Sequence, residues 1–135
     1  MSQFANGVNG VKGSEALEWK MGLLNQSGKY LTAETFGCKI NASGTNLRKK
    51  QLWILEHDQV QDSVVYIRSH LNRYLSCSEK GVVRCDVEKK GEKEQFVIEY
   101  GSDLRNKGKW AIRNEKTGLY FQGEDDNLFC DKAPH

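Results

Sequence analysis

Lys29-Tyr30-Leu31 is the first of three similar triplets that decide the fold of this chain. The second triplet is Arg73-Tyr74-Leu75 and the third is Leu119-Tyr120-Phe121, so their tyrosines lie 44 and 46 residues apart. Apolar residues before and after each triplet recur with nearly the same period. They are Leu23, Ile67 and Ile112 upstream, Ile40, Cys85 and Cys130 downstream, and Trp53 and Phe96 in a fourth column. Self-similarity at a fixed period of this size indicates a repeat architecture.

Each repeat predicts four β-strands. Within a unit of about 44 residues, four short apolar runs are separated by Gly, Asn, Asp and Ser, which is typical of strands joined by turns. A propeller blade has the same period, but a propeller needs about four blades or more, and the chain holds fewer than three complete units. Three such units can instead close into one barrel with a hairpin cap. We therefore predict an all-β chain with the β-trefoil fold and pseudo-three-fold symmetry.

The repeats also predict the domain boundaries. Residues 1–18 show no apolar period, and we expect residues 1–19 to form a disordered N-terminal arm. The β-trefoil domain is then expected over residues 20–135. Its repeats are predicted at about 20–63, 64–108 and 109–135.

One strand is missing from this pattern, because the third repeat stops before a partner of Trp53 and Phe96 would appear. We therefore expect an open seam in the barrel, and we expect the chain to be a piece of a longer protein. The apolar columns should form one buried core. Its predicted members are Leu23, Leu31, Ile40, Trp53, Leu55, Ile67, Leu75, Cys85, Phe96, Ile98, Ile112, Phe121 and Cys130.

Composition limits the kinds of partner. The chain has 135 residues and a formal net charge of +2, so an acidic partner must contact a local basic patch rather than respond to bulk charge. No apolar run approaches the roughly 18 residues that a membrane-spanning helix needs. Residues 1–18 lack the regions of a secretory signal, so we expect a cytoplasmic protein with reduced thiols. The alternative is a secreted protein with two disulfides, formed by Cys38, Cys77, Cys85 and Cys130.

Four segments carry more specific information than the repeat pattern, which indicates only the fold. Tyr-Leu-Thr-Ala-Glu-Thr-Phe-Gly at 30–37, Lys-Ile-Asn-Ala-Ser at 39–43 and Leu-Arg-Lys-Lys-Gln-Leu-Trp at 47–53 closely resemble the first trefoil of fascins, a family of actin-bundling proteins. Arg-Ser-His-Leu-Asn-Arg-Tyr-Leu at 68–75 resembles the second unit of that trefoil. The similarity extends from about Met21 to Cys130.

The resemblance implies that this is the first of four tandem trefoils in a protein that cross-links F-actin into tight parallel bundles. It implies F-actin and further trefoil domains of the same chain as partners, no cofactor, and a place in the cytoplasm, at the cytoskeleton of actin bundles and cell protrusions. The alternative is a carbohydrate- or heparin-binding trefoil. A ricin-type lectin repeats a Gln-x-Trp signature in every unit, whereas this chain has it once, as Gln51-Leu-Trp53.

The candidate binding residues lie in a stretch with one sign of charge. Between Thr35 and Leu55 there are four basic residues, Lys39, Arg48, Lys49 and Lys50, and no Asp or Glu. A run of this kind is either a solvated face or a contact for an acidic surface. The resemblance implies that these residues, together with Lys29, contribute to actin binding.

Ser43 and Thr45 lie a few residues before this basic run and are candidate phosphorylation sites. Fascins carry a regulatory serine in this loop, but Asn46 occupies its aligned position here. Hydrogen bonding within the loop is the alternative role for both hydroxyl groups.

Other function classes find no support. The chain has no Gly-x-Ser-x-Gly, Walker or His-Glu-x-x-His motif, so we predict that it is not an enzyme. His70 has no Cys or acidic neighbour, and the acidic turn Glu124-Asp-Asp126 lacks the ligand spacing of a calcium loop, so no metal site is expected. Nucleic-acid binding requires exposed aromatic residues among the basic residues, whereas Trp53, next to the basic run, alternates as a core residue.

Overall fold

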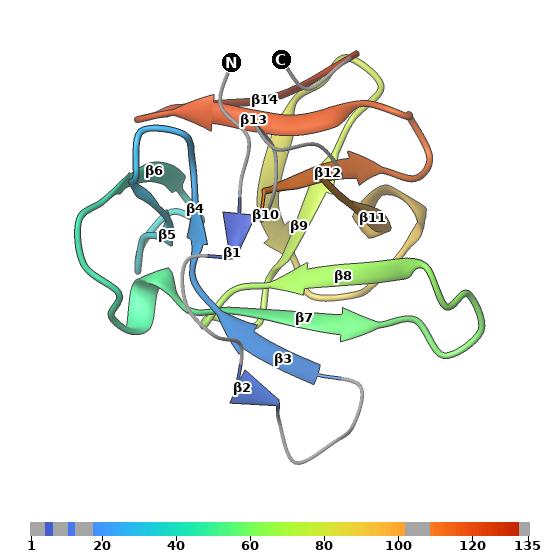
Figure 1. Ribbon diagram of the computed structural model, residues 1–135, viewed down its shortest axis with the longest axis horizontal. Helices are drawn as coiled ribbons and strands as arrows, with labels where there is room; N and C mark the ends of the chain where they lie inside the picture. The colour runs from blue at the N-terminus through green and yellow to red at the C-terminus, as the bar shows by residue number, and fades with distance from the viewer. Residues whose placement is uncertain (1–4, 7–10, 13–17, 102–108, 133–135) are drawn as a thin grey trace.

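The computed structural model describes residues 5–6, 11–12, 18–101 and 109–132. Within these residues the chain forms fourteen short β-strands and two single 3-10 turns (Figure 1). Every strand predicted from the repeats is present. The elements are β1 (Ala5–Asn6), β2 (Val11–Lys12), β3 (Glu18–Met21), β4 (Leu23–Leu24), β5 (Tyr30–Ala33), β6 (Ile40–Gly44), η1 (Lys49–Gln51), β7 (Trp53–His57), β8 (Val64–Arg68), β9 (Tyr74–Cys77), β10 (Val83–Val87), η2 (Glu92–Glu94), β11 (Phe96–Tyr100), β12 (Trp110–Asn114), β13 (Tyr120–Glu124) and β14 (Asn127–Asp131).

The strands follow the order of a β-trefoil. The barrel strands pair antiparallel in the order β3, β7, β8, β11 and β12, and the hairpins β5–β6, β9–β10 and β13–β14 form the cap. Figure 1 shows β3, β7 and β8 side by side at one end of the molecule, with the hairpin β13–β14 at the other. The register brings the predicted columns together, because Leu55 is opposite Ile67 and Ile98 is opposite Ile112. The predicted β-trefoil fold is confirmed.

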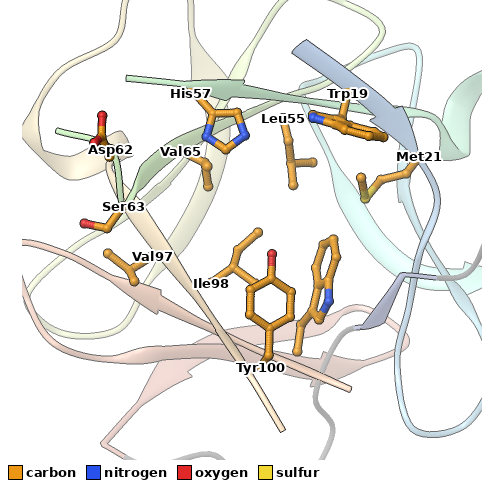
Figure 2. Close-up of a pocket in the computed structure, with 11 residues that line it drawn as sticks. Trp19, Met21, Leu55, His57, Asp62, Ser63, Val65, Val97, Ile98 and Tyr100 are labelled. Carbon is orange, nitrogen blue, oxygen red and sulfur yellow. The ribbon is translucent and has the colours of Figure 1, made fainter. Parts of the chain in front are cut away.

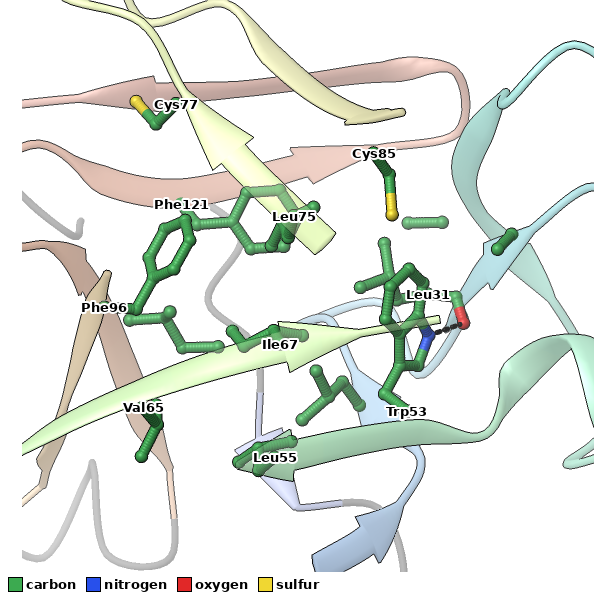
Figure 3. Close-up of a cluster of buried hydrophobic side chains, with 14 of the residues drawn as sticks. Leu31, Trp53, Leu55, Val65, Ile67, Leu75, Cys77, Cys85, Phe96 and Phe121 are labelled. Carbon is green, nitrogen blue, oxygen red and sulfur yellow. Dashed lines mark hydrogen bonds between the residues drawn. The ribbon is translucent and has the colours of Figure 1, made fainter. Parts of the chain in front are cut away.

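The core lies where the repeats predicted it. All the predicted core residues are buried except Ile40 and Ile98, which are half-buried and pack against the same cluster. Trp53 is fully buried, and its indole Nε1–H donates to the carbonyl oxygen of Leu31 at 2.9 Å (Figure 3). A tryptophan can be buried completely only where its N–H finds an acceptor, so this bond fixes the ring in the first repeat.

The structure departs from the sequence at the predicted N-terminal arm. β3 begins at Glu18, before the predicted start of the trefoil at residue 20, and Trp19 packs against the core. Within the arm, β1 pairs with β4 and β2 pairs with β3, while the rest of residues 1–17 lies outside the described residues. The third repeat contributes β12, β13 and β14. The predicted positions 102–108 of the second repeat also lie outside the description. No helix in the described ranges has the length and apolarity that crossing a membrane requires.

Candidate functional site

The candidate site is built on the hairpin β5–β6 and on the turn η1 that follows it. Tyr30 in β5 pairs with Gly44 in β6, and the turn packs against β5. A Cβ at Gly44 would lie 2.7 Å from Thr32 Oγ1 and 3.1 Å from Gln51 Cγ. Only glycine therefore lets η1 approach the hairpin this closely.

Gln51 is the buried residue that orients η1. Its Nε2 donates to Thr32 Oγ1 at 3.1 Å, and its Oε1 accepts a hydrogen bond from the backbone N–H of Arg48 at 3.0 Å. Because Gln51 is directed inward, the three residues before it are left on the surface. Arg48, Lys49 and Lys50, which we call the basic turn, are all exposed.

Glu34 holds one residue of the basic turn against the hairpin. It accepts hydrogen bonds from Asn41 Nδ2 at 2.8 Å and from Lys50 Nζ at 3.2 Å. These two bonds, that of Asn41 first, hold the pKa of the Glu34 carboxyl below its ordinary value. The carboxylate therefore stays ionised at neutral pH and offsets part of the local positive charge.

The predicted actin-binding residues do not form one compact patch. Lys39 lies beside the basic turn, because Glu34, which binds Lys50, also donates its backbone N–H to the Lys39 carbonyl oxygen at 2.8 Å. Lys29 is half-buried before β5, so it lies at the opposite end of the hairpin from Lys39, roughly 17 Å away at about 3.4 Å per residue. Within the described part of the chain, Lys50 is the one member of the predicted set that forms an ion pair.

Ser43 and Thr45 are both exposed near the end of β6. The backbone N–H of Ser43 donates to Asn41 Oδ1 at 3.1 Å, and Thr45 Oγ1 accepts a long 3.5 Å hydrogen bond from Asn46 Nδ2. Neither hydroxyl group has a buried partner among the described residues. Their assignment as phosphorylation sites stays a prediction.

Phe36 is a surface residue that the sequence reasoning missed. It lies in the loop between β5 and β6, three residues before Lys39, with 83% of its surface exposed. An exposed aromatic ring beside basic residues is characteristic of protein-binding surfaces, where aromatic and arginine side chains carry much of the affinity. The sequence feature that could have predicted its exposure is the position of Phe36 within the turn Glu34-Thr-Phe-Gly37.

A cavity lies in the barrel, away from the hairpin β5–β6. This cavity of about 400 Å³ is lined mainly by apolar side chains, among them Trp19, Leu55 and Ile98 (Figure 2). His57, Asp62 and Ser63 also line it, but no hydrogen bond joins any two of these three in the part of the chain that the structure describes. Their residue types match a hydrolase triad, whereas their geometry does not.

The fold and the site define a β-trefoil domain with an exposed basic surface on its first repeat. The fascin domain model matches residues 27–134, and the chain belongs to the fascin family. It is 41% identical to Fascin-2 of Bos taurus over 117 residues, which is 86% of this chain. It is 37% identical to Fascin of Strongylocentrotus purpuratus over 117 residues, which is 87% of this chain. The chain spans 23% of the length of each of these relatives.

A solved structure shares the fold at low sequence identity. The cytolethal distending toxin of Haemophilus ducreyi superposes with a TM-score of 0.65 at 12% identity, over 83% of this chain and 72% of that one. At this level of identity the similarity concerns the fold alone.

Proposed function

We propose that this chain is an actin-filament-binding module of a fascin-like protein that organises F-actin into tight parallel bundles. Membership of the fascin family supports the proposal. The observation that carries it is the basic turn. Buried Gln51 holds this turn on the surface, and among the described residues Arg48 and Lys49 form no ion pair.

The proposed contact surface comprises the basic turn, Lys39 and the exposed Phe36, with Lys29 as a separate contact at the other end of the hairpin. The surface of an actin filament is acidic, and complementary charge raises the rate of association and fixes orientation. Each exposed pair contributes only about 0–1 kcal/mol, so the charges act together and the affinity falls with salt.

A single trefoil with one such surface binds one filament and does not bundle, because bundling needs two separated sites. The further sites come from other trefoil domains of the same protein, in keeping with the 23% of the relatives' length that this chain spans. The module has no catalytic role and acts in the cytoplasm, at the actin cytoskeleton.

Phosphorylation of Ser43 or Thr45 would oppose binding. A phosphate adds about −1.5 to −2 charges close to the basic turn. It would cancel much of the positive charge that Arg48 and Lys49 present.

The alternative is a carbohydrate- or heparin-binding trefoil, since a basic surface also suits a sulfated polysaccharide. The test is high-speed cosedimentation of this chain with F-actin, alongside a heparin column and a glycan array. The proposal predicts salt-sensitive binding to filaments without low-speed pelleting. Retention on heparin or the array with no cosedimentation at low salt would favour the alternative and contradict actin binding.

A further inference from the structure

Leu47 lies directly before the basic turn, in the loop that joins β6 to η1. Unlike the basic turn that follows it, Leu47 is half-buried. Its side chain lies over Gly22, because a Cβ on Gly22 would be only 2.6 Å from Leu47 Cδ1. The same Cβ would be 2.8 Å from Cε1 of Tyr30. Leu47 and the Tyr30 ring therefore cover this glycine together.

The lack of a side chain at Gly22 makes this contact possible. Gly22 connects β3 to β4, and its φ is not in the left-handed region, so its backbone does not itself require glycine. A methyl group there would instead occupy the space that Leu47 fills. Because β4 pairs with β5, this seat for Leu47 fixes the loop to the sheet that carries the hairpin β5–β6.

The second repeat anchors the equivalent turn by a different contact. Leu47 and Lys90 both lie six positions before the buried aromatic residue of their repeat, and Gly22 and Tyr66 both lie directly before its upstream apolar column. Lys90 Nζ lies 5.1 Å from the centroid of the Tyr66 ring and forms an ion pair with Glu56 at 3.2 Å. The anchor is thus apolar before η1 and cationic before η2.

This difference decides how many cations each turn can present. The charge of Lys90 is directed back onto the sheet by the Glu56 carboxylate and the Tyr66 ring, so it is partly neutralised. A leucine anchor uses no cation, and all three residues of the basic turn stay on the surface. Unlike an ion pair, an apolar contact is also not screened by salt.

We propose that Leu47 is the positioning residue of the filament-binding surface, and that its apolar seat on Gly22 allows η1 rather than η2 to present a basic surface. This inference rests on the proposed function of the basic turn. Gln51 holds the end of that turn from beneath, and Leu47 holds the chain where the turn begins. With both ends fixed, the exposed cations keep one arrangement, and less ordering is required when a filament binds.

Limited proteolysis with trypsin tests the anchor without actin, because each residue of the basic turn is a cleavage site. Leu47→Ala should open the turn and speed cleavage within it by roughly tenfold, since most of the buried surface of the anchor is lost. Cleavage at Lys89 and Lys93, beside and within η2, should keep the wild-type rate. The melting temperature should fall by no more than about 5 °C. Leu47→Met, which restores a long apolar side chain, should recover the protection.

Lys90→Ala is the matched control, because it removes the anchor of η2 and leaves Leu47 in place. It should speed cleavage at Lys89 and Lys93 and leave the basic turn protected. In high-speed cosedimentation with F-actin, Leu47→Ala should bind roughly threefold to tenfold more weakly, because a turn that is competent only part of the time lowers the affinity by that fraction. Lys90→Ala should bind like the wild type.

Gly22→Ala gives an independent measurement if Leu47→Ala folds poorly, since its methyl group should displace Leu47 and expose the same cleavage sites. The anchor is ruled out if cleavage of the basic turn is unchanged in Leu47→Ala, or is equally faster beside η2. An opened turn with wild-type filament binding would overturn the positioning role. If the wild type itself does not bind filaments at low salt, the proposed function fails, while the proteolysis still decides whether Leu47 anchors the turn.

Discussion

The turns η1 and η2 occupy equivalent places in the first and second repeats, and they have nearly the same backbone. Each is a single 3-10 turn flanked by extended residues, with the residue after it at φ −89°, ψ 126° in η1 and φ −85°, ψ 126° in η2. Each packs against the strand that opens its own hairpin, β5 or β9. Each is followed by a fully buried aromatic residue, Trp53 or Phe96.

The charges of the two turns differ. η1 reads Lys49-Lys50-Gln51 after Arg48, whereas η2 reads Glu92-Lys93-Glu94 after Gly91. Glu92 forms an ion pair with Lys116 at 3.0 Å. The fold therefore requires a turn with an inward third residue and an aromatic residue two positions later, but it does not require positive charge. The basic residues of η1 are free to be selected for binding.

The largest loss of stability is expected from truncating the buried aromatic residue that follows each turn, and the two repeats should respond alike. Trp53→Ala and Phe96→Ala should each lower the free energy of unfolding by about 3–5 kcal/mol, because each leaves a large cavity in a core that cannot collapse around it. Urea unfolding followed by circular dichroism measures both. If either variant unfolds at the wild-type urea concentration, the two repeats do not share one core.

Gln51→Ala should lower the free energy of unfolding by about 1–3 kcal/mol. It removes the hydrogen-bond donor to Thr32 Oγ1 and the acceptor for the backbone N–H of Arg48. Thermal denaturation gives this value. Gln51→Glu, which gives η1 the residue found in η2, is the matched variant and should lose only the bond to Thr32. A wild-type melting temperature for Gln51→Ala would show that the inward residue does not fix the turn.

Glu94→Gln should make stability less dependent on pH. Burial raises the pKa of Glu94 above its ordinary value of 4.5, so its contribution is fully present below that pH and is lost as the pH rises through the folded-state pKa. The variant should therefore melt above the wild type at pH 7 and should lose that advantage below pH 4.5. A constant difference between the two melting curves from pH 4 to 8 would contradict this assignment.

Glu34→Gln should change the free energy of unfolding by less than about 1 kcal/mol, because its ion pair with Lys50 is exposed. It should also strengthen filament binding, since it removes the carboxylate that offsets the basic turn. Cosedimentation and thermal denaturation of the same preparation test both parts. Weaker binding would mean that Glu34 is itself a contact.

Much of this fold could be predicted because it repeats. Four columns of residues at one period specified the strands and the core, including Cys85 and Cys130, which are unremarkable singly. The start of β3 was placed too late because the alternation that begins at Trp19 is short and directly follows a Gly-rich segment with no period, whereas the structure pairs Glu18–Met21 with β7. Local pattern carries no information about such long-range pairing.

The candidate site could be predicted only in part. The basic turn is contiguous in sequence, so charge counting found it. The separation of Lys29 from Lys39 depends on the direction of β5. The ion pair between Glu34 and Lys50 joins residues that are 16 positions apart in the chain.

The most direct test of the central claim reverses charge on the two turns separately. Arg48→Glu/Lys49→Glu alters η1, and Lys89→Glu/Lys93→Glu makes the same change in charge at and beside η2. Both should melt close to the wild type, because all four side chains are exposed. In high-speed cosedimentation with F-actin at low and at moderate salt, the η1 variant should lose most of its binding while the η2 variant keeps it. Equal binding by the two variants at both salt concentrations would contradict the claim that the basic turn faces the filament.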